Sequence, residues 1–251
     1  MKMYFPKISI WSAFYISLCF YFKWYKETIV LFSIILIHEY AHVLMAKYFK
    51  YDFKGVILYP FGAVAKINDY GWHINREDLW VAIAGICSHL FLLSFSNLFK
   101  HIFGEHLGNY YIQFNWQIML FNMLPIYPLD GHKIIQCLLS YQIDYLKSIQ
   151  ISLVISYVCL FYLIRYNFQL HYLIVYIFLF MQILSYHKKY YYHYISFLIN
   201  RKDDLRRKPT LNKKRVFYKN KHNYYLTKEG IINEKIAIKS RFFIDNENIW
   251  W

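Results

Sequence analysis

Residues 31–48 read LFSIILIHEYAHVLMAKY, an apolar stretch typical of a membrane helix, with an H-E-x-x-H motif at its centre. Its two histidines, His38 and His42, are four residues apart, so they share one helix face and both can reach one metal ion. Glu39 lies between them, where it can take a proton from a bound water. The alternative is a pair of histidines that only pack or hydrogen-bond between helices. An ionisable cluster in an apolar span is costly and usually functional, and the alternative gives Glu39 no role, so we favour a metal site.

Composition points to an integral membrane protein. The chain has 251 residues, of which 58% are hydrophobic and 22% aromatic, whereas a soluble domain is nearer half apolar. The net charge is +14, and the segment from residue 187 onward supplies most of it, with sixteen basic and six acidic residues. This predicts a basic cytoplasmic tail that can contact the lipid bilayer, and we expect no direct binding of nucleic acid. The four cysteines form no C-x-x-C pair and are read as buried apolar residues.

The apolar pattern predicts an all-α polytopic membrane protein with six transmembrane helices. The expected spans are Ile8–Phe22, Thr28–Phe49, Leu79–Phe99, Tyr110–Tyr127, Ile149–Ile164 and Leu170–Tyr186. The first span is expected to stay uncleaved, since no small-residue cleavage site follows it. Tyr51–Asp69 is too polar to cross, and its glycines and proline predict a hairpin of two short strands that turns at Tyr59–Gly62. Lys100–Asn109 is expected to be a polar loop.

Loop charges set the expected orientation. With the N-terminus inside, the cytoplasmic segments up to the sixth span carry nine lysines and arginines and the outside loops four, which favours cytoplasmic N- and C-termini. We therefore expect a membrane domain at residues 1–190 and a basic cytoplasmic tail at 191–251. In this orientation the two histidines lie in the inner half of the second span.

A second motif, NMLPIYPLDG at residues 122–131, ends the fourth span at the same depth. Its two prolines break the helix, which predicts that Asp130 projects from a fixed, irregular segment. Two histidines and one carboxylate are a usual catalytic zinc set, with the fourth position left to water. His38, His42 and Asp130 are therefore the expected ligands of one Zn²⁺ per chain. With zinc polarising a carbonyl, Glu39 would pass its proton to a leaving amine.

Asn122 and two histidines are the other polar groups near the two motifs. Asn122 can bind a substrate backbone or an oxyanion, or it can satisfy backbone groups freed by Pro125, and both readings stay open. Asn122, Pro125 and Pro128 are the substrate-binding candidates. His132 is not expected as an extra ligand, because neighbouring residues rarely point at the same ion as Asp130. His89 is read as a residue that hydrogen-bonds between helices.

Taken together, the two motifs resemble the site-2 protease family of intramembrane zinc metalloproteases, most of all its sporulation branch in endospore-forming bacteria. The resemblance covers roughly residues 1–190. It implies cleavage of a membrane-associated protein within or near the bilayer, here a sigma factor precursor of the pro-sigma-K type. It also implies inhibitory membrane partner proteins, a location in the outer forespore membrane, and a membrane-re-entrant position for the hairpin at Tyr51–Asp69.

Several residues depart from the family pattern. Gly85-Ile86 and His89 stand where the family often has a Gly-Pro pair and an asparagine, and His132 replaces a second glycine after the Asp-Gly pair. The tail is short for the nucleotide-sensing domain of the sporulation branch, although Tyr224–Asn233 predicts one hairpin.

The substrate, and with it the function, has alternatives. The same mechanism can act on an anti-sigma factor or a signal-peptide remnant, and a non-enzymatic metal transporter or scaffold can use the same ligands. A homo-oligomer stays open. Basic residues such as Lys219 and Lys221 alternate with aromatic residues in the tail, so we expect it to lie on the membrane and hold a cytoplasmic substrate there.

Overall fold

The computed structural model describes every residue of the expected metal site. The described residues are 7–8, 21, 23–59, 62–68, 73–166, 169, 172–201, 207–212, 216–227 and 230–243. Most of the predicted first span lies outside them. Ile8, its expected first residue, lies in strand β1 (Lys7–Ile8).

One compact unit comprises Met1–Asp69, Trp80–Leu124 and Leu129–Gly131. Its helices are α2 (Tyr25–Tyr48), most of α3 (Asn75–Ser94), α4 (Ser96–Phe103), α5 (Glu105–Asn122) and the start of α6 (Asp130–Gln142). Helix α2 contains neither glycine nor proline, and it ends where Lys50 adopts a left-handed backbone conformation. Three helices share an apolar core made by Val30 and Ile34 of α2, Leu92 of α3 and Tyr111 of α5.

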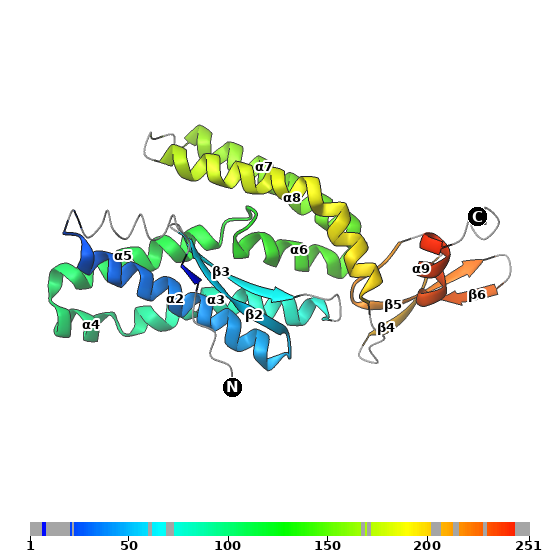
Figure 1. Ribbon diagram of the computed structural model, residues 1–251, viewed down its shortest axis with the longest axis horizontal. Coiled ribbons are helices and arrows are strands. Elements are labelled where there is room, and N and C mark those ends of the chain that lie inside the picture. Colours follow the sequence, from blue (N-terminus) through cyan, green and yellow to red (C-terminus); the bar gives the residue numbers. More distant parts are fainter. Residues whose placement is uncertain are drawn as a thin grey trace. The chain divides into compact units, whose positions relative to one another are not determined.

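The sheet of this unit confirms the predicted hairpin. Strand β2 (Asp52–Tyr59) pairs antiparallel with β3 (Gly62–Asn68), with Tyr59 opposite Gly62 as expected from the turn signal. Strand β1 adds to the other edge of β2 in parallel. Helix α2 contacts both β2 and β3, which lie beside it in Figure 1. The re-entrant position of the hairpin stays a prediction.

The region after α3 corrects the sequence analysis. The predicted third span, Leu79–Phe99, is divided between α3 and α4, and the predicted loop Lys100–Asn109 is helical except at Gly104. The reason is that Gly104 has a φ of 86°, a conformation that glycine adopts without strain. One glycine therefore completes the turn between α4 and α5. The polar side chains lie along the two helices, and Lys100 pairs with Glu105 at 3.4 Å.

A second compact unit comprises Tyr70–Leu79, Pro125–Pro128 and His132–Trp251. It contains the remainder of α6, then α7 (Tyr145–Tyr166) and α8 (Leu173–Ile199), which pack side by side (Figure 1). A small sheet follows, in the order β4 (Lys208–Asn212), β5 (Lys221–Thr227) and β6 (Gly230–Asn233), with α9 (Glu234–Phe243) against β5 and β6. The antiparallel pair of β5 and β6 confirms the hairpin predicted in the tail. Helix α8 continues past residue 190, so the expected domain boundary falls inside a helix.

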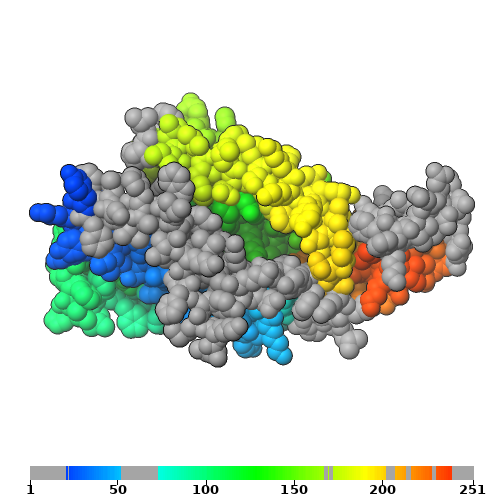
Figure 2. Space-filling model, viewed as in Figure 1, coloured from blue at the N-terminus to red at the C-terminus, as the bar shows by residue number. Residues whose placement is uncertain are grey.

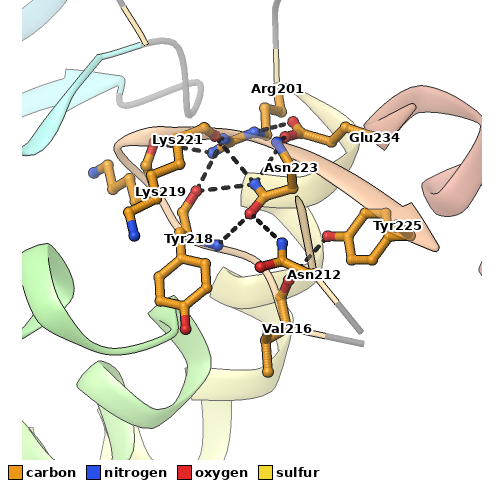
Figure 3. A network of polar contacts seen from close by, with 9 residues as sticks. All are labelled: Arg201, Asn212, Val216, Tyr218, Lys219, Lys221, Asn223, Tyr225 and Glu234. Carbon is orange, nitrogen blue, oxygen red and sulfur yellow. Dashed lines mark hydrogen bonds and ion pairs between the residues drawn. The ribbon is translucent and has the colours of Figure 1, made fainter. Parts of the chain in front are cut away.

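A buried polar network organises this C-terminal sheet (Figure 3). The Arg201 guanidinium pairs with Glu234 and donates to the backbone carbonyls of Tyr218, Lys219 and Lys221. Asn223 donates through its side chain to the other Glu234 oxygen at 2.8 Å. A buried charge is costly unless it is paired and hydrogen-bonded. These bonds therefore hold the end of α8 in place relative to the sheet.

The turn before β5 is docked onto the first turn of α3. The Lys219 ammonium forms an ion pair with Asp78, and both side chains are less than 5% exposed. The side-chain oxygen of Asn220 accepts a hydrogen bond from the backbone N–H of Asn75 at 2.8 Å, as a helix cap does. This part of the tail is therefore folded against α3. The sequence analysis expected Lys219 to lie on the membrane, and that prediction was wrong because the side chain is buried in the ion pair.

Three of the described helices are long and apolar enough to cross a membrane, namely α2, α3 and α7. They correspond to the predicted second, third and fifth spans, whereas the count of six stays a prediction. Large apolar side chains face outward on these helices, for example Leu44, Phe91 and Phe161, each more than half exposed. Helix α8, yellow in Figure 2, also has exposed apolar side chains. Ile174 and Met181 are both more than half exposed. Outward apolar surfaces of this kind are typical of a membrane protein.

Candidate metal centre

Helix α2 brings the two histidines of the motif together as its period requires. His38 and His42 are 4% and 8% exposed, although both are polar, and their rings meet edge to face with centroids 4.6 Å apart. Their Nε2 atoms are 3.1 Å apart. Two imidazole nitrogens therefore face the same point inside an apolar helix packing.

Asp130 reaches the same point from another part of the chain. Its Oδ2 lies 3.3 Å from Nε2 of His38 and 3.1 Å from Nε2 of His42. The residue is the first of α6, so the expectation of an irregular position was wrong: the irregular segment ends at Leu129. Gly131 makes this possible, because a Cβ there would overlap the backbone carbonyls of residues 123 and 124. The chain can thus return closely on itself just before the carboxylate.

The three groups fit a zinc ion by distance and by chemistry. All three ligand atoms lie within 4.8 Å of one another. Zinc bonds of about 2.0–2.1 Å at tetrahedral angles place neighbouring ligand atoms about 3.3 Å apart. The observed separations of 3.1–3.3 Å between the three ligand atoms match this expected distance. Asp130 Oδ2 has no hydrogen-bond partner in the described part of the chain, which is costly unless a cation occupies the space between the three groups.

Helix α3 supports this centre from one side. The Nδ1 of His42 donates to the backbone carbonyl of Val81 at 2.7 Å, which leaves its Nε2 as the lone-pair atom. Gly85 lies one helical turn further on, and a Cβ there would overlap both imidazoles, 2.6 Å from the nearest His38 carbon and closer still to His42. The sequence analysis missed both contacts. Val81 acts through its backbone and leaves no signal, whereas the glycine in an apolar helix was a usable sign of close approach.

The remaining predicted site residues lie on α2, on α5 or just after α5. Glu39 is partly buried beside the histidines on α2. Asn122 is the last residue of α5, and its Nδ2 donates to the Ile118 carbonyl at 3.1 Å, so one of its two amide hydrogens is already bonded. Pro125 and Pro128 lie in the irregular segment before α6, with Pro125 partly buried and Pro128 exposed.

Ser156 of α7 fastens that proline segment and was not foreseen. Its hydroxyl lies 3.2 Å from the backbone N–H of Tyr127, which donates to it, and 3.1 Å from the Pro125 carbonyl, to which it can donate. His132 Nδ1 also contacts this hydroxyl at 2.9 Å. The sequence did carry a signal, because serines recur every four residues along this apolar helix. The structure shows that all three are fully buried: Ser148, Ser152 and Ser156.

Comparison with known proteins gives relatives of one kind. The chain is 28% identical over 183 residues to stage IV sporulation protein FB of Bacillus subtilis, covering 70% of this chain and 64% of that protein. It is 27% identical over 135 residues to a zinc metalloprotease of Methanocaldococcus jannaschii, covering 51% of this chain and 39% of that protein. The chain thus spans less than two thirds of the length of these relatives. No protein-family model matches it.

A solved structure shares the fold. The site-2 protease from Methanocaldococcus jannaschii superposes with a TM-score of 0.56 at 20% sequence identity, over 71% of this chain and 88% of that one. At this identity the structural match concerns the fold. Together with the sequence relatives, it confirms the resemblance of this chain to the site-2 protease family.

Proposed function

We propose that this chain is an intramembrane zinc metalloendopeptidase that cleaves a membrane-associated protein within or near the bilayer. The observation that carries the proposal is the convergence of His38, His42 and Asp130, at ligand distances, on an apolar helix that also carries Glu39. The relatives and the shared fold support the same activity.

In this proposal the two Nε2 atoms and the Asp130 carboxylate would hold one zinc ion per chain. Zinc in such a site lowers the pKa of a coordinated water toward about 7 and polarises a substrate carbonyl. The Val81 carbonyl fixes the ring of His42, so that only its Nε2 is available as a ligand.

The chain's own side chains carry the proton and orient the substrate. Glu39 accepts a proton from the attacking water and delivers it to the leaving amine as the peptide bond breaks. Among the described residues, Asn122 donates one amide hydrogen to Ile118, and we propose that the other binds a substrate carbonyl or its oxyanion. Pro125 and Pro128 hold the adjacent backbone in a non-helical conformation, which we propose binds an extended substrate.

The substrate assignment rests on a more distant analogy. The similarity to a stage IV sporulation protein supports a role in sporulation, and we propose a sigma factor precursor of the pro-sigma-K type as substrate. The corresponding location is the outer forespore membrane with both termini cytoplasmic, where inhibitory membrane proteins would control the protease. An anti-sigma factor or a signal-peptide remnant is the alternative substrate, and the chemistry at the metal centre is the same for all three.

The test separates metal binding from cleavage. The chain is co-expressed in turn with a tagged sigma factor precursor, a tagged anti-sigma factor and a tagged signal-peptide remnant, and zinc content is measured on the purified protein. Glu39→Gln should keep zinc and lose cleavage, because an amide cannot accept the water's proton. Glu105→Gln, an identical change at a side chain that is 81% exposed, should leave both unchanged. Near-normal cleavage by Glu39→Gln would refute the proposed chemistry, whereas zinc binding by a wild-type chain that cleaves none of the three substrate classes would favour a non-enzymatic metal protein.

A further inference from the structure

A third buried histidine lies next to the two that form the candidate metal centre. His89 of α3 is 0% exposed, and its ring centroid is 4.9 Å from that of His38, with the planes tilted by 34°. Its Nδ1 lies 2.7 Å from the side-chain oxygen of Asn115 on α5, which is also 0% exposed. A fully buried histidine and amide pair beside a metal site is expensive unless its polar atoms are used.

Hydrogen-bond chemistry fixes which His89 nitrogen is free. An amide oxygen can only accept, so Nδ1 of His89 carries the proton and donates it to Asn115. A neutral imidazole carries one N–H, so Nε2 of His89 is a bare acceptor. This Nε2 is buried and has no hydrogen-bond partner in the part of the chain that the structure describes.

The neighbouring ring, His38, has a buried hydrogen-bond donor without an acceptor among the described residues. His38 directs Nε2 at His42 and Asp130, so a metal-binding His38 carries its proton on Nδ1. That Nδ1 is likewise buried without a partner among the described residues. Two imidazoles joined in line by an N–H···N bond have centroids roughly 5 Å apart, given a donor–acceptor distance of about 2.9 Å. The observed separation of 4.9 Å is close to that spacing, although the two nitrogens are not hydrogen-bonded to each other in this structure.

We propose that His89 is a positioning residue for the metal centre. With zinc bound, Nδ1 of His38 donates to Nε2 of His89, whose Nδ1 donates to Asn115. This relay orients His38 as the Val81 carbonyl orients His42. The inference rests on the proposed zinc site, and it gives His89 and Asn115 a role in metal affinity beyond packing α3 against α5.

The experiment is a competitive zinc titration of the purified full-length chain in detergent, with Co²⁺ absorption as a second readout of ligand geometry. His89→Phe removes the acceptor and should weaken zinc binding about 10- to 100-fold. His89→Gln can accept from His38 and donate to Asn115, so it should retain most of the affinity. Asn115→Asp keeps the acceptor and should bind zinc like wild type, whereas Asn115→Leu should not.

The matched control removes a different bond between the same helices. The Tyr111 hydroxyl of α5 donates to the Leu92 carbonyl of α3 at 2.6 Å, so Tyr111→Phe tests helix packing without touching the relay. Zinc affinity and a Co²⁺ spectrum in His89→Phe that equal those of Tyr111→Phe would overturn the inference. Should His89→Phe not fold, equal affinities in Asn115→Leu and Asn115→Asp would overturn it in the same way. A wild-type chain that binds no zinc would instead refute the proposed function, so the two failures are distinguishable.

Discussion

The buried ion pair between Lys219 and Asp78 gives a sharp prediction about the C-terminal tail. Both side chains are less than 5% exposed, so Lys219→Met removes the ammonium group that pairs with the buried Asp78 carboxylate. Removing one partner of a buried pair typically costs about 3–5 kcal/mol of unfolding free energy. The population of the opened C-terminal region should rise roughly a hundred- to a few-thousand-fold, at about 1.4 kcal/mol per factor of ten. Limited proteolysis of the detergent-solubilised chain measures this, when opening is fast relative to cleavage.

Two further variants show whether the ion pair is the cause. Lys208→Met makes the same change at an exposed lysine of β4 and should alter the rate of proteolysis little. Adding Asp78→Asn to Lys219→Met removes the buried negative charge as well and should recover most of the lost stability, since uncharged replacements of a buried pair are often tolerated. If Lys219→Met is as protected as Lys208→Met, or if the double variant is no more stable than the single one, the reasoning fails.

The remaining predictions concern the metal centre and the topology. Gly85→Ala should abolish zinc binding, because the new Cβ would push both imidazoles out of place. The shift would far exceed the roughly 0.2 Å by which ligand distances in a metal site can vary. Zinc binding at wild-type affinity would contradict the observed packing. Asp130→Ala should purify without zinc, and full occupancy would remove Asp130 from the ligand set. Ser156→Ala frees the proline segment and should lower cleavage without changing zinc content; a variant with unchanged cleavage would show that this fastening is dispensable. Reporter fusions should give cytoplasmic signals at Lys50, Lys147 and Lys208, and outside signals at Glu27, His106 and Asn167. An outside signal at Lys208 would contradict the six-span count.

The docking of the tail also changes how its role should be tested. If the tail only holds a substrate, deleting residues 212–251 should weaken substrate association without affecting zinc. In the structure, that deletion also removes Lys219 and Asn220, which pair with and cap the first turn of α3. Loss of substrate binding after such a deletion would therefore mix docking with damage to α3. Changes confined to exposed tail residues, such as Tyr224 or Leu226, test substrate docking more directly.

Much of the arrangement around the metal centre follows from local sequence. The four-residue spacing of His38 and His42 places both rings on one face of any α-helix, so their approach needed no tertiary information. The turn residues between β2 and β3 fixed a hairpin for the same local reason. Asp130 was predicted to be a partner from its expected depth in the membrane, although its place at the start of a helix was not foreseen.

Only the tertiary structure decided what surrounds these groups. Val81 contributes a backbone carbonyl, which every residue possesses, so no pattern could single it out. The partners Asn115 of His89 and Lys219 of Asp78 lie 26 and 141 residues away, and such pairings depend on how whole helices pack. Sequence periodicity reports which face of an element is apolar, because that is set by local geometry. Which polar atoms meet across two such faces is set by long-range packing, and that information is spread over the entire chain.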